Sequence, residues 1–218
     1  MEPGRPVAAV LFDLDGVLTD TSEAHYLAWQ RLADEEGLSF DRAANEALRG
    51  LSRAESLAVL LAGHPVPAPQ RADLMERKNR YYRESLEHRP PRLLPGAQAA
   101  VEAAARRGLR TAVVSSSRNT GHILALLGIA ERFDHVSDGR AVPNAKPAPD
   151  LFLHAAAALR VPIGRCLVVE DAASGVAAAL AAGARVVGIG PEERVGAAHQ
   201  RFDSMAEFDL EAAVKPKL

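Results

Sequence analysis

The sequence has little cysteine and few aromatic residues, and these scarcities already exclude some classes of protein. Aromatic residues make up 5% of the 218 positions, and Cys166 is the single cysteine, which excludes an internal disulfide. Cys166 falls in an apolar, strand-like run, so we expect a buried thiol and not a reactive one. The formal net charge of −2 gives no basis for nucleic acid or an anionic membrane as a partner.

Long apolar runs are also lacking. No stretch is long enough to span a bilayer, and the N-terminal residues hold no signal-peptide core, so we expect a cytoplasmic protein. With 48% hydrophobic and 25% charged residues, the composition is that of an ordinary soluble globular protein. The length suits one large domain, or a core with a smaller second domain.

The stretch from Val10 to Asp20 combines an apolar run with two aspartates. Its first residues predict a strand buried on both faces within a parallel sheet. An Asp-Gly turn with solvated carboxylates would explain Asp13, Asp15 and Gly16 taken alone. However, ionised aspartates at the end of a buried strand are costly unless they are paired or bound to metal. We therefore expect them at the carboxyl end of a central strand, where open α/β sheets hold ligands.

The rest of the chain divides into a helical stretch and an alternating one. Residues 21–92 contain no convincing strand, and their apolar spacing predicts helices at about 23–36, 41–49, 52–62 and 69–86. From residue 93, helices alternate with strands, which we expect at 110–114, 133–136, 166–169 and, as the last strand, 185–189.

This alternation predicts an α/β fold with a doubly wound, mostly parallel, Rossmann-like sheet. Residues 1–20 and 93–218 would form the core domain. Residues 21–92 would form an inserted all-helical cap domain, which we expect to cover the sheet edge where Asp13 emerges.

Polar residues follow the later predicted strands as well. Ser115 follows the second strand, Glu170 and Asp171 end the fourth, and Lys146 stands just before a helix. Taken singly, Ser115 would be an ordinary helix cap and Lys146 a solvated surface residue. Taken together, a hydroxyl and loop amides can hold phosphate oxygens, a cation can neutralise them, and clustered carboxylates select Mg²⁺. There is no Cys/His cluster to suggest zinc.

The string FDLDGVLTD, residues 12–20, resembles the nucleophile motif of the haloacid dehalogenase-like superfamily. The hydroxyl, lysine and acidic pair follow in the order that this resemblance requires. It implies phosphoryl transfer, with Asp13 as the nucleophile that forms an aspartyl-phosphate and Asp15 as general acid and base. Ser115 and Lys146 would hold and neutralise the phosphate. The expected metal ligands are the carboxylates of Asp13, Glu170 and Asp171 and a backbone carbonyl, and Asp15 is counted among the metal-binding residues.

Four further motifs are similar to those of the β-phosphoglucomutase family, a cap-bearing branch of this superfamily. They are HxxxW at 25–29, LRGLSR at 48–53, RKN at 77–79 and SSSRN at 115–119. The similarity covers nearly the whole chain and implies a small-molecule sugar phosphate as the partner. The substrate-binding residues that it implies are His25, Trp29, Gly50, Arg53, Lys78, Ser117, Arg118 and Asn119.

The resemblance also implies roles for these residues. Arg53, with Arg118 and its loop neighbours, would hold a second phosphate, and His25 and Lys78 would link cap closure to the positioning of the acid/base. Read alone, His25 is an ordinary interface histidine, Trp29 packs the cap, and both arginines are surface charges. The family carries a Lys at position 118, so Arg118 keeps the charge but changes its geometry.

The function implied by the resemblance is interconversion of β-D-glucose 1-phosphate and D-glucose 6-phosphate through a β-glucose 1,6-bisphosphate intermediate. The alternative is a sugar-phosphate or small-metabolite phosphatase with the same core residues. A non-catalytic binding protein on the same scaffold is a third interpretation, against which the intact nucleophile, acid/base and metal residues argue. We expect a monomer, because a cap must be able to swing freely.

Overall fold

The computed structural model describes residues 6–215, and the chain forms two compact units. The first consists of the residues up to Asp20 and those from Arg92 onwards, and the second is Thr21–Pro91. We call them the α/β unit and the helical unit. Within the described residues, no helix is both long enough and apolar enough to cross a membrane.

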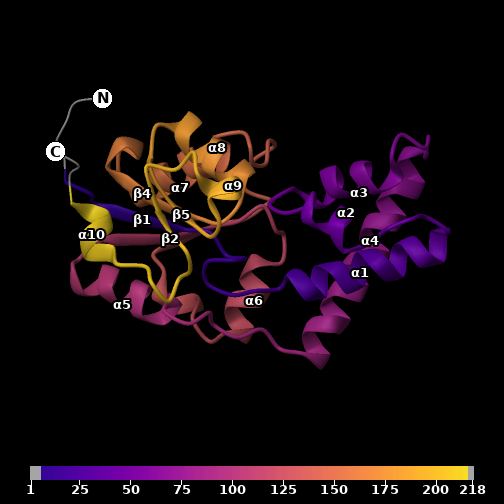
Figure 1. Cartoon of the computed structure of the whole chain (residues 1–218), viewed down its shortest axis with the longest axis horizontal. Helices are drawn as coiled ribbons and strands as arrows, with labels where there is room; N and C mark the ends of the chain where they lie inside the picture. The colour runs from indigo at the N-terminus through magenta and orange to yellow at the C-terminus, as the bar shows by residue number, and fades with distance from the viewer. Residues whose placement is uncertain (1–5, 216–218) are drawn as a thin grey trace. The chain divides into compact units, whose positions relative to one another are not determined.

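The α/β unit is built on a six-stranded parallel sheet with the strand order β3-β2-β1-β4-β5-β6 (Figure 1). The prediction of a doubly wound parallel sheet is thereby confirmed. The central strand β1 is fully buried, and Phe12 at its end lies in register with Val113 of β2 and Val169 of β4. The carboxyl ends of these three strands therefore meet at one edge. The strands are β1 Ala9–Phe12, β2 Arg110–Val114, β3 His135–Ser137, β4 Cys166–Glu170, β5 Arg185–Ile189 and β6 Gln200–Phe202.

Helices cover both faces of this sheet. Figure 1 shows α7 and α8 on one side and α5 with α10 on the other. Side chains alternate between the two faces along a strand. Ala9 and Leu11 of β1 therefore pack in one apolar cluster with α7 and α8. Phe12 packs edge-on against Phe133 instead, with 6.2 Å between the ring centroids. The helices of this unit are α5 Ala97–Arg106, α6 Thr120–Leu126, α7 Asp150–Leu159, α8 Ala173–Ala182, α9 Glu192–Val195 and α10 Leu210–Val214.

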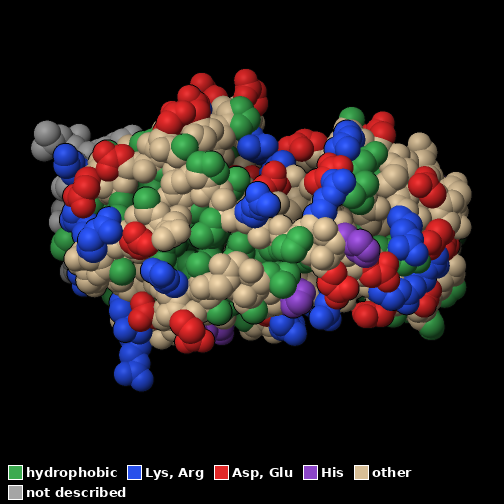
Figure 2. Space-filling model, turned by 90° about the horizontal axis from the view of Figure 1, so that it is seen from below, with side chains coloured by type: hydrophobic (Ala, Val, Ile, Leu, Met, Phe, Trp, Pro, Cys, Tyr) green, Lys and Arg blue, Asp and Glu red, His purple; other side chains and the backbone are tan. Residues whose placement is uncertain are grey.

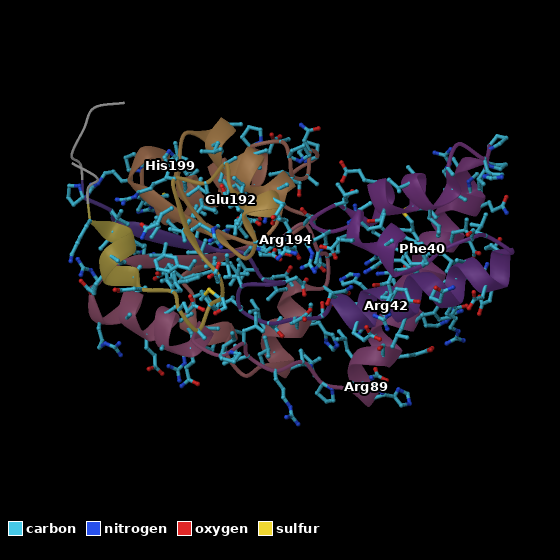
Figure 3. All side chains as sticks on the ribbon, viewed as in Figure 1. Phe40, Arg42, Arg89, Glu192, Arg194 and His199 are labelled. Atoms are coloured by element: carbon cyan, nitrogen blue, oxygen red, sulfur yellow. The ribbon has the colours of Figure 1, made fainter. Side chains whose placement is uncertain are left out.

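Two strands differ from the sequence prediction. The strand at 185–189 is not the last, because Gln200–Phe202 adds a short parallel edge strand beside β5. This edge strand is half-exposed and shows no apolar alternation. It is held in place by the neighbouring His199 (Figure 3). The His199 amide donates to the Val186 carbonyl, and its Nδ1 accepts from the Val186 amide. The third strand begins at His135 and not at residue 133, since its pairing with β2 starts at Ala112.

The helical unit contains four helices, as predicted for residues 21–92. The longest two, α1 and α4, pack against each other through buried side chains that include Leu32 and Leu74. A capping box between Ser52 and Glu55 starts α3. The second helix is shorter than predicted, because the residues after Glu46 form turns. The helices are α1 Ser22–Glu36, α2 Arg42–Glu46, α3 Arg53–Leu61 and α4 Ala68–His88.

The surface of the helical unit carries charges of both signs in close pairs. Arg42 forms a salt bridge with Glu23 at 2.7 Å and covers the ring of Tyr26, which stacks on Phe40 (Figure 3). On the face drawn in Figure 2, acidic and basic side chains are interspersed over this unit. Such a surface offers no extended basic area for a polyanion on that face.

Candidate active site

The turn after β1 places Asp13 at the carboxyl edge of the sheet. Asp13 is 8% exposed, and its amide still donates to the Val169 carbonyl at 2.9 Å, so its backbone belongs to the sheet. Three residues later the backbone of Gly16 turns with a φ of 80°. A Cβ at Gly16 would lie 2.1 Å from Oδ2 of Asp171, so only glycine lets the two loops approach this closely.

Lys146 lies between the carboxylates at this edge. Its side chain is 2% exposed, and Nζ donates to Oδ1 of Asp13 and to Oε1 of Glu170, both at 2.5 Å, and to the Val114 carbonyl at 2.9 Å. A solvated surface lysine is thereby excluded. The ammonium joins groups at the carboxyl ends of β1, β2 and β4, and so fixes the nucleophile candidate relative to the loop that begins at Ser115.

Three buried carboxylates form one group beside Lys146. Oxygens of Asp13, Glu170 and Asp171 lie within 4.8 Å of one another. Burial raises the pKa of Asp13 well above its usual value; Lys146 opposes this rise, and Glu170 and Asp171 add to it. Burial alone would lower the pKa of Lys146, but Asp13 and Glu170 raise it above its usual value. One ammonium against three carboxylates leaves a hard, oxygen-rich group that fits a divalent cation.

The group of three carboxylates does not include that of Asp15. The regular strand alternation stops at Asp13, because Asp15 forms an isolated bridge with Thr19 and the Gly16 amide donates to the Thr19 carbonyl at 2.7 Å. The half-buried Asp15 therefore follows the turn and not the strand.

The loop after β2 is held by its own serines. The buried Ser115 donates its amide to the Ser137 carbonyl, and its Oγ accepts from the Ser117 amide at 3.1 Å. In the same way, Oγ of Ser117 accepts from the Asn119 amide at 3.1 Å. Arg118 is exposed, and its carbonyl accepts from Nη2 of Arg140 at 2.9 Å. Ser115, Ser117, Arg118 and Asn119 thus belong to one ordered loop of the α/β unit.

The helical unit brings the remaining predicted residues into two clusters. In the first, Nζ of Lys78 lies 2.6 Å from Nδ1 of His25 and 4.9 Å from the ring centre of Trp29. Burial, then the charges of Lys78 and Arg53, lower the pKa of His25 well below its usual value. A neutral His25 can accept a hydrogen bond from the Lys78 ammonium. Trp29 is 2% exposed, so its ring packs within this cluster and does not offer a face to a ligand.

The second cluster lies at the start of α3. Gly50 turns the chain with a φ of 76° shortly before the helix, and Arg53 is its first residue. Nη2 of Arg53 donates to Oδ1 of Asn79 at 2.8 Å. Sequence reasoning did not assign a role to Asn79, although it stands in the RKN motif next to Lys78.

The family model described as a haloacid dehalogenase-like hydrolase matches residues 7–183. Among curated proteins, the chain is 41% identical over 187 residues to a beta-phosphoglucomutase of Bacillus subtilis, covering 84% of this chain and 83% of that protein. It is 31% identical over 182 residues to a fructose-1-phosphate phosphatase of Escherichia coli, covering 84% and 96%.

Among solved structures, a beta-phosphoglucomutase of Clostridium difficile matches with a TM-score of 0.90 at 33% identity, covering 94% of this chain and 95% of that one. The family-model match covers strands β1 to β4, the carboxylate group and the helical unit. The chain therefore belongs to the haloacid dehalogenase-like hydrolase family, as an enzyme related to phosphomutases and phosphatases of phosphorylated sugars.

Proposed function

We propose that this enzyme is a phosphomutase that interconverts β-D-glucose 1-phosphate and D-glucose 6-phosphate through β-glucose 1,6-bisphosphate. The observation that carries phosphoryl transfer is the buried ammonium of Lys146, which contacts both Asp13 and Glu170. A carboxylate and a phosphate dianion repel each other, and a cation at this position lowers the cost of bringing them together. The 41% identity to a beta-phosphoglucomutase supports the choice of reaction.

In this proposal Asp13 is the nucleophile and Asp15 the general acid and base. The 6-hydroxyl of β-glucose 1-phosphate attacks phosphorus of the aspartyl-phosphate, Asp15 takes its proton, and the bond from phosphorus to Asp13 breaks, which gives the bisphosphate and frees Asp13. A carboxylate oxygen of Asp13 then attacks phosphorus of the 1-phosphate, the bond from phosphorus to the sugar oxygen breaks, and Asp15 returns its proton to that oxygen, which gives glucose 6-phosphate and renews the aspartyl-phosphate. Ser115 and Lys146 hold the phosphoryl oxygens during both steps.

We propose Mg²⁺ as the metal, held by the carboxylates of Asp13, Glu170 and Asp171 and by a backbone carbonyl, with Asp15 among the metal-binding residues. Clustered carboxylate oxygens suit a hard cation that keeps waters and takes a substrate phosphate as a further ligand. When bound, Mg²⁺ supplies positive charge that neutralises the phosphate.

A mutase also needs to bind a second phosphate. We assign this role to Arg53, Ser117, Arg118 and Asn119, because guanidinium groups bind phosphate oxygens in a bidentate manner. Gly50 would shape the turn before Arg53. The pair of His25 and Lys78 would couple a helical cap, residues 21–91, to the positioning of Asp15. We take the enzyme to work as a monomer on a small sugar phosphate.

The proposed reaction is tested with purified protein, Mg²⁺, β-D-glucose 1-phosphate and a trace of β-glucose 1,6-bisphosphate. Glucose 6-phosphate and free phosphate are measured in parallel. We expect glucose 6-phosphate to form without a matching release of phosphate. Replacing Asp13 with Asn should abolish both products, since no aspartyl-phosphate can then form.

The second candidate is a sugar-phosphate or other small-metabolite phosphatase, which the identity to a fructose-1-phosphate phosphatase favours. The same assay separates the two. Release of phosphate without glucose 6-phosphate would establish hydrolysis and overturn the mutase proposal, and the substrate would then be sought among other sugar phosphates.

A further inference from the structure

Arg53 begins helix α3, and its side chain is held by a residue of another helix. Nη2 of Arg53 donates to Oδ1 of Asn79 on α4 at 2.8 Å. The two residues are 26 positions apart in the sequence, so this bond joins two helices and is not a contact within one helical turn. Asn79 therefore restricts the direction in which the Arg53 guanidinium points.

Both ends of this bond are anchored by contacts that need no ligand. At the start of α3, the Ser52 amide donates to Oε2 of Glu55 at 2.8 Å, and Oγ of Ser52 accepts from the Glu55 amide. On α4, Asn79 follows Lys78, which is 2% exposed and is held beside His25. A guanidinium held between two fixed helices is oriented before a ligand arrives, which lowers the entropy cost of binding that ligand.

The residue that holds Arg53 is an amide, and this choice matters for an arginine that binds an anion. A carboxylate at position 79 would accept the same hydrogen bond, but its negative charge would compete with the anion for the guanidinium. An amide oxygen accepts the bond and adds no charge. The charge of Arg53 acts on its surroundings, since it helps to lower the pKa of His25, after burial and the charge of Lys78.

We propose that Asn79 is a positioning residue for Arg53: its amide oxygen orients the guanidinium for the second phosphate of a sugar bisphosphate and adds no negative charge that would compete with that phosphate. This inference rests on the proposed function, because a second phosphate has to be bound in a mutase. Asn79 acts through Arg53 and is not itself a ligand of the phosphate.

Binding of β-glucose 1,6-bisphosphate to the full chain with Mg²⁺ tests this role. Asp13→Asn serves as the background, since it cannot accept the phosphoryl group and calorimetry then gives a Kd without turnover. In this background, Asn79→Ala should raise the Kd about three- to tenfold, as for the loss of one hydrogen bond. Asn79→Asp should raise it more, about ten- to hundredfold, because a carboxylate of the same size pairs with Arg53 and repels the phosphate.

Asn79→Asp also separates the positioning role from a purely structural one. A carboxylate still accepts from Arg53, so Asn79→Asp should be at least as stable as Asn79→Ala in thermal unfolding without ligand. If the bond served only to join α3 and α4, Asn79→Asp would keep that bond and would leave the Kd of the bisphosphate unchanged. Equal Kd values with and without Asn79→Asp would therefore overturn this inference.

Two further variants make the result specific to Arg53. Gln70→Glu makes the same change from amide to carboxylate at an exposed position of α4, and it should change the Kd by less than about twofold. In an Arg53→Ala background, Asn79→Asp should change the Kd by less than about threefold, because the group through which it acts is gone. An undiminished effect of Asn79→Asp without Arg53 would contradict the proposed role.

The parallel assay of glucose 6-phosphate and free phosphate tests the proposed function separately. If the enzyme with Asp13 intact releases phosphate and forms no glucose 6-phosphate, the mutase proposal fails, while the Kd values still decide whether Asn79 positions Arg53 for a phosphate. If glucose 6-phosphate forms and Asn79→Asp leaves the Kd unchanged, the proposed function stands and the role of Asn79 is overturned.

Discussion

The buried ammonium of Lys146 balances two carboxylates at once, and its removal should be costly. In Lys146→Met, Asp13 and Glu170 lose the cation that contacts both of them. We expect the free energy of unfolding without metal to fall by about 3–5 kcal/mol, as when one partner of a buried ion pair is lost. Phosphoryl transfer should slow by about a hundred- to a thousandfold.

Urea unfolding in EDTA and in Mg²⁺ measures this effect. Mg²⁺ should restore part of the lost stability, because it supplies positive charge to the same carboxylates. The double variant Lys146→Met/Glu170→Gln should be more stable in EDTA than Lys146→Met, since one of the unbalanced charges is gone. If Lys146→Met unfolded like wild type in EDTA, the ammonium would not balance these carboxylates.

For single residues, sequence reasoning identified those that the carboxyl ends of the strands bring together. Asp13 and Ser115 each follow a buried strand, Glu170 is the last residue of another, and parallel strands bring these ends to one edge. Their proximity could therefore be predicted. That the Oγ of Ser116 has no hydrogen-bond partner within residues 6–215 could not be predicted, because it depends on which segments pack against this loop. The departure of Asp15 from the strand could not be predicted either, because it follows from backbone pairing within the turn.

Among the elements, α1 and α4 are joined by a network centred on Glu35. Its carboxylate accepts from the Tyr81 hydroxyl and from Nη2 of Arg77, both at 2.6 Å. These bonds lower the pKa of Glu35 from its usual 4.5 to about 2. A carboxyl group whose pKa falls on folding stabilises the fold above its unfolded pKa. That contribution is lost as the pH falls from about 4.5 to about 2.

We therefore expect Glu35→Gln to lower the unfolding temperature at pH 7, and to lower it progressively less as the pH falls below 4.5. Circular dichroism melts from pH 7 to pH 3 would measure the difference from wild type. Glu76→Gln, a change at an exposed position of the same helix α4, serves as the control and should change little at any pH. A constant difference between Glu35→Gln and wild type across this range would contradict the prediction.

The strands that sequence reasoning missed or misplaced, β6 and β3, are short and lie at the edges of the sheet. Strands β1, β2, β4 and β5 have nearly continuous apolar runs because helices cover both of their faces. Strand β6 has three residues, QRF, and no face that is fully buried. Its place beside β5 is fixed by the bonds of His199, a contact between segments that no local pattern contains.

For the molecule as a whole, the interruption of the α/β pattern revealed an insertion. The chain leaves the α/β unit after Asp20 and returns at Arg92. The Leu94 amide donates to the Leu18 carbonyl and the Thr19 hydroxyl to the Arg92 carbonyl. Because exit and return are bonded to each other within the α/β unit, a helical unit can be inserted between β1 and β2 without disturbing the sheet. The loss of strand periodicity over residues 21–92 made this predictable.

The last prediction concerns the different roles proposed for the two units in binding the phosphates of the substrate. If Arg53 of the helical unit binds the second phosphate of a bisphosphate, Arg53→Ala should reduce kcat/KM of the mutase reaction about ten- to hundredfold. Hydrolysis of p-nitrophenyl phosphate, which has one phosphate, should change less than about threefold. Coupled assays on one enzyme preparation would give both numbers, with Arg83→Ala, an exposed arginine of α4, as the control. Equal losses of kcat/KM in both reactions would contradict the assignment of Arg53 to the second phosphate site. A residue that binds only that phosphate cannot affect a substrate that lacks it.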